Sequence, residues 1–211
     1  MMDEWGYYLK FFVSLVAVVN PPGIIPIFID ASRGMNSSER KQTGDLASYT
    51  VFMVLTLSLI SGDAIIRFFG ISIASFRVAG GVLLLLSAIS MLQAKLSPEK
   101  QSEEEAIDLE SRKSLAVVPL GIPLLAGPGA ISTVILHAQK HLNIAHYFSL
   151  FIVITALSAL VWCLLRLSSL IALKIGKTGI NLITRIMGLI MAAIGVEFIA
   201  SGLKQFFPGL G

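Results

Sequence analysis

Residues 11–29 read FFVSLVAVVNPPGIIPIFI, and this stretch decides how the rest of the chain is interpreted. Its 19 uncharged residues are enough to cross the hydrocarbon core of a membrane as a helix. Because proline lacks a backbone N–H and clashes with the preceding turn, Asn20-Pro21-Pro22-Gly23 and Pro26 predict a break within that helix. The acidic flank formed by Asp3 and Glu4 is unlike that of a signal peptide, so we interpret the stretch as a retained span.

Further apolar segments follow the first along the whole chain. Four uncharged runs hold 17, 17, 23 and 19 residues, at 46–62, 78–94, 114–136 and 147–165, and a sixth segment at 180–207 carries only Arg185, Glu197 and Lys204. The chain is 55% hydrophobic and 14% charged, which lies outside the range of soluble proteins. We therefore predict an all-α polytopic membrane bundle of six transmembrane helices. Too little chain remains for a soluble catalytic or nucleotide-binding domain.

The charged segment 95–114 separates the third and fourth predicted spans and holds ten of the 29 charged residues. We interpret it as a solvated tether between two halves, and the alternative is a regulatory or partner-binding segment. Nine basic residues lie on its side of the membrane and four on the other, so the positive-inside rule predicts that this loop is cytoplasmic and that both termini are outside. The basic residues are dispersed over loops, which is not the pattern of a nucleic-acid-binding protein.

The sequence contains an internal repeat. Pro22-Gly23 recurs as Pro128-Gly129 after 106 residues, and Arg77-x-x-Gly80 recurs as Arg185-x-x-Gly188 after 108. Two pairs in the same order and at nearly the same spacing indicate two three-helix units. Since three is odd, the second unit enters the membrane from the opposite side, which is the inverted repeat typical of secondary transporters. The predicted units are residues 1–94 and 115–211.

The two predicted breaks lie ~15 Å deep, near the bilayer middle, where unpaired backbone is tolerated only if it is buried or lines a cavity. Half-helices beginning near Ile24 and Ala130 would offer N–H groups to a carboxylate, and those ending near Val19 and Ala126 would offer carbonyls to an ammonium group or a cation. A small neutral amino acid carries both charges. The alternative interpretation is a pair of packing kinks. The predicted substrate-binding residues are Asn20, Pro21, Pro22, Gly23, Ile24, Gly127, Pro128, Gly129, Ala130, Ser132 and Thr133.

Four ordered motifs closely resemble those of the MarC family, and the resemblance covers nearly the whole chain. They are N-P-P-G-I-I-P at 20–26, F-G-I-S-I-x-S-F-R-V-A-G-G at 69–81, P-L-L-A-G-P-G-A-I at 123–131 and T-R-I-M-G at 184–188. The chain looks nearest to the YchE-like branch. The resemblance implies a multi-pass protein of the bacterial inner membrane, with periplasmic termini on the topology above. Because some members are described as transporters of small neutral amino acids, it also implies transport of glycine and alanine.

Arg77, at the start of the third predicted helix, and Arg185 and Glu197, within the sixth, are expected inside the membrane, where charges are costly and usually functional. Arg77 and Arg185 are expected to bond free carbonyls at a helix break or to act as gates, and the alternative is a structural clamp on a carboxylate. Glu197 is the carboxylate expected to be deep, so it is the candidate for proton coupling, against an ion pair with Arg77 or a packing role. A sodium site made of carbonyls near the breaks is the competing mechanism.

The remaining chemistry-bearing residues favour no enzyme. His137, His141 and His146 gather around one loop, and although His137 and His141 have zinc-compatible spacing, nothing nearby completes a ligand set, so we predict an interfacial loop and no metal site or cofactor. No nucleophile is followed by a suitably spaced base in the predicted spans. The partners expected are a small-molecule substrate and the lipid bilayer, and the sequence leaves the oligomeric state open. The alternatives to amino acid transport are an exporter of drugs or other metabolites and a non-transporting membrane protein.

Overall fold

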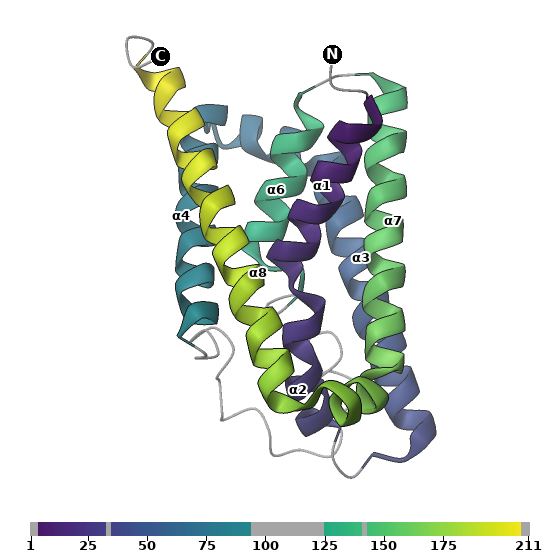
Figure 1. The fold of residues 1–211 in the computed structure, drawn as a ribbon. Coiled ribbons are helices and arrows are strands. Elements are labelled where there is room, and N and C mark those ends of the chain that lie inside the picture. Colours follow the sequence, from purple (N-terminus) through teal and green to yellow (C-terminus); the bar gives the residue numbers. More distant parts are fainter. Residues whose placement is uncertain (1–3, 33–34, 94–124, 141–142, 208–211) are drawn as a thin grey trace.

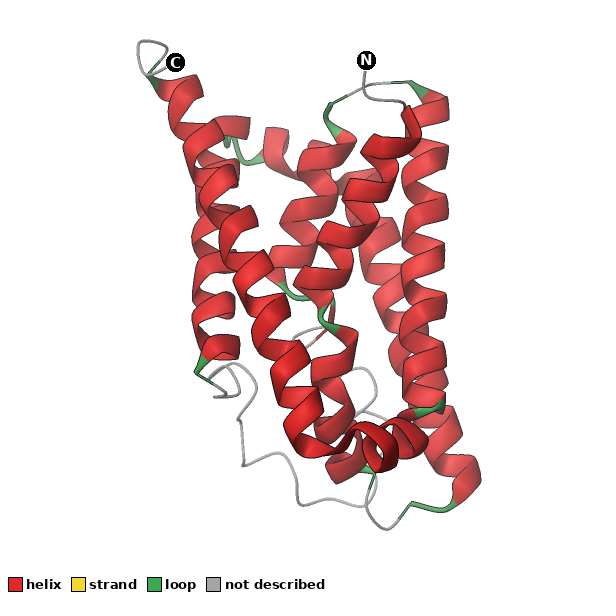
Figure 2. Cartoon of the chain, in the orientation of Figure 1, coloured by secondary structure: helices red, strands yellow, loops and turns green. Residues whose placement is uncertain are grey.

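The computed structural model describes residues 4–32, 35–93, 125–140 and 143–207, and within these ranges the chain is helical with short connections (Figure 2). The helices are α1 (Glu4–Val19), α2 (Pro21–Ala31), α3 (Ser37–Phe68), α4 (Ile73–Leu92), α6 (Pro128–Ala138), α7 (Ile144–Arg166) and α8 (Ser168–Phe206). The prediction of an all-helical membrane protein is confirmed. The predicted loop 95–114 and the first part of the fourth predicted span lie outside the described residues.

Within the described residues, five helical stretches are long and apolar enough to cross a membrane, whereas six spans were predicted for the whole chain. They are Gly6–Ile29, Ser37–Phe68, Ile73–Leu92, Ile144–Arg166 and Thr178–Phe206, and the first of them contains both α1 and α2. The fourth predicted span is represented by α6, which has 11 residues and is too short to cross alone. The six-span count therefore stays a prediction.

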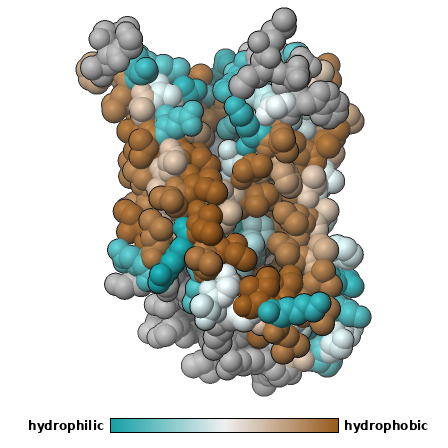
Figure 3. All heavy atoms as spheres, in the orientation of Figure 1, coloured by the Kyte–Doolittle hydropathy of each residue, from teal (hydrophilic) through white to brown (hydrophobic). Residues whose placement is uncertain are grey.

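The helices are arranged as two pairs with the broken segments between them. In Figure 1, α4 and α8 form one side of the bundle, α3 and α7 form the other, and α1 and α6 lie between the two pairs. The N- and C-terminal ends lie at the same end of the bundle. Large apolar side chains such as Ile60, Leu86 and Leu189 are exposed, and Figure 3 shows an apolar middle with polar residues at both ends. This distribution fits a protein whose sides face lipid.

The antiparallel pair α4/α8 is held by small residues that let the two backbones touch. A Cβ built on Gly195 would lie 2.8 Å from the carbonyl oxygen of Gly81, and one on Gly202 would lie 2.9 Å from that of Ala74. Seven residues before Gly195, a Cβ on Gly188 would lie 3.3 Å from the carbonyl oxygen of Ala88. Small residues are a common way to pack helices closely in membranes, where apolar burial gives little driving force.

The pair α3/α7 is held by larger side chains. Phe52 and Phe151 pack edge to face with ring centroids 5.6 Å apart. At one end of the pair, Arg166 binds Asp45 at 2.8 Å, and Trp162 donates a hydrogen bond to the same carboxylate through Nε1. Because Asp45 and Arg166 are both partly exposed, the ion pair orients the helix ends more than it stabilises the fold.

Side-chain caps determine where several of these helices begin. The Asn36 side chain accepts hydrogen bonds from Ser38 and Glu39 N–H at the start of α3, and Glu39 completes a capping box. Ser72 and Asn143 cap α4 and α7 in the same manner. By contrast, α8 has no side-chain cap and contains a kink at Gly176, whose φ is 69°. Residues 168–175 therefore form a short segment that is separated by the kink from the long span.

Candidate functional site

The first predicted break is found at Asn20, between α1 and α2. Asn20 has a φ of 47°, in the left-handed region, where asparagine is one of the few tolerated residues besides glycine. The proline that follows disfavours a helical conformation at Asn20, which explains why α1 stops there. Asn20 N–H still bonds the Val16 carbonyl at 2.9 Å, and Gly23 N–H bonds the Asn20 carbonyl at 3.0 Å. The chain therefore breaks at one residue and immediately restarts as a helix.

The two prolines leave this break rich in hydrogen-bond acceptors. In an unbroken helix, the N–H groups of residues 21 and 22 would bond the carbonyls of Ala17 and Val18, but Pro21 and Pro22 have none. The helix restarts at Pro21, earlier than the expected start near Ile24, so its first two positions offer no donor either. This helix start therefore offers fewer N–H donors to a carboxylate than an ordinary one, and the end of α1 lacks the N–H donors of two residues that would normally bond its carbonyls.

The Asn20 side chain adds an unpaired acceptor to the same place. Asn20 is 5% exposed, and its Oδ1 has no hydrogen-bond partner among the described residues, while Nδ2 approaches Met91 Sδ at 3.8 Å. The amide folds over Gly23, because a Cβ built there would overlap it and would also lie 3.1 Å from Thr184 Oγ1. A buried acceptor without a partner costs about 1–3 kcal/mol, so this oxygen is suited to receive a donor from a ligand.

Thr184 and Met91 complete this environment, although the sequence analysis did not select them. Met91 belongs to α4 and lies 71 positions from Asn20 along the chain. Thr184 belongs to α8 and directly precedes Arg185 in the fourth motif. Neither residue could be assigned to the break from the sequence, since both reach it only through helix packing.

At the second predicted break, the structure describes residues from Leu125 onward, and the helix that starts there has different surroundings. α6 begins at Pro128 with Gly127 as its N-cap, and no side chain caps it. The N–H groups of Ala130 and Ile131 both bond the Gly127 carbonyl, at 3.0 and 3.1 Å. A Cβ built on Gly129 would meet apolar atoms, Leu84 Cδ2 at 2.7 Å and Val18 Cγ1 at 3.4 Å. Apolar side chains therefore surround the start of α6, whereas the Asn20 amide occupies the corresponding space at the first break.

The hydroxyls expected to help bind substrate at the second break are buried and engaged in packing. Thr133 donates its hydroxyl to the Gly129 carbonyl at 2.8 Å and is fully buried. Ser132 is also buried and lies against α4, because a Cβ on Gly80 would come within 3.2 Å of its Oγ. Thr133 therefore bonds the first turn of its own helix, and Ser132 packs α6 against α4.

The structure brings the two breaks together in the interior of the bundle. Val18, near the end of α1, lies against the start of α6 at Gly129. Residues on both sides of each break share one buried apolar cluster, namely Val19, Ile24, Leu125, Ala126 and Ala130. The end of α1 and the start of α6 therefore lie side by side in the bundle.

Comparison with known proteins places this arrangement in a family. The family model described as "MarC family integral membrane protein" matches residues 5–207. The chain belongs to the MarC family. It is 44% identical to the UPF0056 membrane protein YhcE of Escherichia coli strain K12, covering 98% of this chain and 96% of the relative. It is 38% identical to the UPF0056 membrane protein YvbG of Bacillus subtilis strain 168, covering 98% of each chain. No solved structure matches the chain.

The two intramembrane arginines of this MarC-family chain lie near opposite ends of the α4/α8 pair. Arg77 is half-buried in the first turns of α4, and Arg185 is exposed in the part of α8 that follows the kink. Within the ranges that the structure describes, neither arginine has a carboxylate or carbonyl partner. Their expected roles at the helix breaks or as gates stay predictions.

Glu197 lies within the span Thr178–Phe206, on a side of α8 that faces away from α4. Its side chain is exposed on α8, not buried, and it makes no ion pair with Arg77. The reason is helical phase, because the α4-facing residue Gly195 lies two positions earlier, about 200° around the helix. Its predicted role in proton coupling is untested by this placement.

The histidines join three helices at the end of the bundle that carries the termini. His146 is 2% exposed, and its ring bonds Tyr8 Oη at 3.0 Å through Nδ1 and the His137 carbonyl at 2.9 Å through Nε2. His137 bonds the Thr133 carbonyl through Nδ1 at 2.8 Å. The two residues therefore belong to the packed helix ends, while His141 lies outside the described residues.

Proposed function

We propose that this MarC-family protein is a secondary active transporter of small neutral amino acids, with its substrate site at the break between α1 and α2. The observation that carries the proposal is the buried, unpaired Oδ1 of Asn20 beside a helix end whose last carbonyls have lost their usual donors. An ammonium group supplies several donors and a positive charge, which such a set of acceptors favours.

The size and neutrality of the substrate follow from what surrounds this break. Gly23, Thr184 and Met91 enclose the Asn20 amide, so little room is left for a side chain on the ligand. The sequence carries no charged residue in 11–29 or 114–136, so neither broken segment offers a partner for a charged side chain. The positive end of the α6 dipole favours the substrate carboxylate, since α6 begins at Pro128 without a side-chain cap.

The packing of the helices supports an alternating-access mechanism. α2 packs against α8, and α6 packs against α4, so each segment that follows a break contacts the third helix of the other proposed unit. The pairs α4/α8 and α3/α7 each combine one helix from either unit. Packing of each unit's helices against helices of the other unit is expected for an inverted repeat with units 1–94 and 115–211. Residence in a bacterial inner membrane, with both termini periplasmic, completes the proposal.

The coupling ion has two candidates within this proposal. The carbonyls at the end of α1 and Asn20 Oδ1 are hard oxygen ligands, which also suit Na⁺. Glu197 is the candidate for proton coupling, and its exposure on α8 requires that it meet water or a partner during the cycle. Imposing sodium and proton gradients separately distinguishes the two.

The test is Asn20→Gly in proteoliposomes loaded for counterflow of labelled glycine and alanine. Glycine accepts the left-handed backbone of residue 20 without strain but removes the amide. We expect the unchanged protein to take up both amino acids. The variant should lose at least tenfold in affinity, because one charge-assisted hydrogen bond of about 1.5–3 kcal/mol is lost. Its melting temperature should not fall.

The matched control is Asn36→Gly, because Asn36 is an exposed N-cap for which glycine costs only a few tenths of a kcal/mol. This variant should transport normally. If Asn20→Gly binds substrate with normal affinity, the Asn20 amide is not part of the substrate site. Absence of counterflow in the unchanged protein would reject transport of these amino acids.

A further inference from the structure

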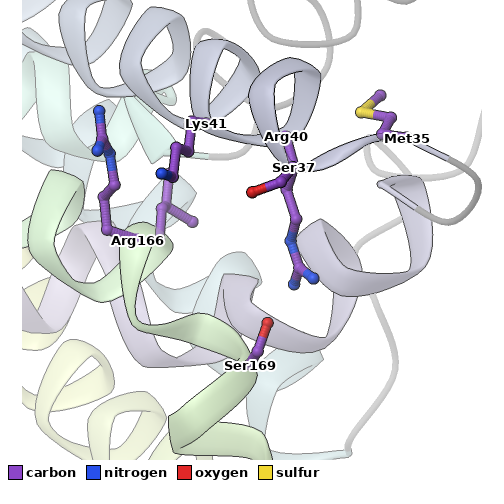
Figure 4. Close-up of a pocket in the computed structure, with 8 residues that line it drawn as sticks. Met35, Ser37, Arg40, Lys41, Arg166 and Ser169 are labelled. Carbon is purple, nitrogen blue, oxygen red and sulfur yellow. The ribbon is translucent and has the colours of Figure 1, made fainter.

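A basic cavity lies at the opposite end of the bundle from the termini, where α3 begins and α7 gives way to α8. Its volume is about 360 Å³, within the range of ~300–1,000 Å³ that small-molecule sites usually have. Three basic side chains and two serines contribute to its lining: Ser37, Arg40, Lys41, Arg166 and Ser169. Figure 4 shows Arg40 extending from α3 toward Ser169 on the start of α8, with Lys41 between Arg40 and Arg166.

The charge of this cavity is not neutralised within the described part of the chain. Arg166 is paired with Asp45, which takes up its charge. Arg40, in contrast, contacts uncharged groups of the described chain: it donates a hydrogen bond of 3.2 Å to Ser168 Oγ, and its guanidinium carbon lies 5.5 Å from the centre of the Phe28 ring. Lys41 has no carboxylate partner among the described residues. Two cations and two serine hydroxyls therefore face one cavity, which is the composition of a phosphate site.

The position of the cavity relative to the lipid identifies the source of the phosphate. The segment 168–175 borders the cavity through Ser169. It exposes Leu170 and Leu173, and the exposed Leu167 directly before it continues the spacing of three residues on the same side. Exposed leucines on a segment set off by a kink are suited to lie among the outer parts of lipid chains. Trp162, exposed beside Arg166, is the residue type that gathers at the level of lipid headgroups.

From these contacts we infer that the cavity binds the phosphate of an anionic phospholipid, with its acyl chains along the leucines of 168–175. Arg40 and Lys41 bind the phosphate oxygens, and the hydroxyls of Ser37 and Ser169 donate to the remaining ones. The sequence predicts that this end of the bundle is cytoplasmic, where anionic lipids attract basic residues. The site is independent of the proposed transport site, which lies at the helix breaks.

The test uses the purified full-length chain in detergent, titrated with phosphatidylglycerol and separately with phosphatidylcholine, with bound lipid counted by native mass spectrometry. Lys41→Gln should weaken phosphatidylglycerol about fivefold and Arg40→Gln/Lys41→Gln about 25-fold, because each basic residue near a membrane surface attracts anionic lipid by about that factor. Phosphatidylcholine should bind more weakly, since its choline cation would approach the same two side chains.

The matched control is Arg67→Gln/Lys204→Gln, which removes two exposed positive charges at the other end of the bundle and should change binding less than twofold. Lys41 is exposed, so Lys41→Gln keeps the test valid even if the double variant folds poorly. Equal losses in the control, equal binding of the two lipids, or unchanged affinity in Lys41→Gln would each overturn the site. Full displacement of the lipid by millimolar inorganic phosphate would overturn the lipid as its ligand and leave a free-anion site.

Discussion

The two helix breaks have related sequences but different chemistry. Before Pro21 stands Asn20, whose buried amide fills the space over Gly23. Before Pro128 stands Gly127, and the space over Gly129 is filled by the side chains of Leu84 and Val18. Proline and glycine therefore fix where each helix breaks, while the residue before the proline determines whether the break is polar.

This difference suggests a division of roles between the repeated segments. The first break presents acceptors from a side chain and from the end of α1, so in the proposed site it is the part suited to a positive group. The second break packs against apolar side chains and contributes the start of a short helix. Substitutions at matching positions should consequently have unequal effects.

The largest effect is expected from Gly23→Ala. Its Cβ would overlap the Asn20 amide, which is fixed by a left-handed backbone and packed beside Thr184, so the amide must leave its place. Loss of a hydrogen bond to a charged group lowers affinity by about 10- to 100-fold. Glycine and alanine should be affected alike, because the methyl group displaces the amide and does not narrow a pocket. Binding of both to the purified protein measures this.

The control for that variant is Gly6→Ala, where a Cβ on α1 meets nothing within 4 Å. Alanine is a better helix former than glycine, so this change should leave binding intact and raise the melting temperature slightly. A selective loss of alanine binding in Gly23→Ala would instead show that Gly23 itself lines the pocket.

A smaller effect is expected from Gly129→Ala. Its Cβ would meet the far end of the Leu84 side chain, which is buried and flexible enough to adjust. We expect a loss of stability of about 1 kcal/mol, typical of mild overpacking, and less than a threefold change in substrate affinity. The loss should vanish in a Leu84→Ala background, as a double-mutant cycle on chemical denaturation would show. A large affinity loss at Gly129 would make the two breaks equivalent.

The smallest effect is expected from Thr184→Val, which removes one hydroxyl beside the first break at nearly constant volume. If this hydroxyl contacts the ligand as a neutral partner, affinity should fall about 2- to 10-fold. Thr155→Val is the control, because its hydroxyl bonds the Phe151 carbonyl on the exposed face of α7. Equal effects of the two variants on binding would exclude Thr184 from the site.

The breaks could be predicted from the sequence because the chemistry of proline is local. Asn20 and Pro128 interrupt or begin helices for reasons contained in two or three neighbouring residues. Thr184 could not be predicted, since it reaches Gly23 only after α2 packs on α8. The exposure of Glu197 was missed although a signal exists, because the glycines at 188, 195 and 202 mark the packed side of α8.

These glycines also limit how the helices can move. Contacts pair Ala74 with Gly202, Gly81 with Gly195, and Ala88 with Gly188, so the small residues recur every seven positions on both helices. Sliding one helix along the other would bring large side chains against backbone until a full period of ~10 Å had been crossed. Any smaller displacement in a working cycle must therefore carry α4 and α8 together as one body, with the strain taken up where the chain is already interrupted, at Asn20 and Gly176.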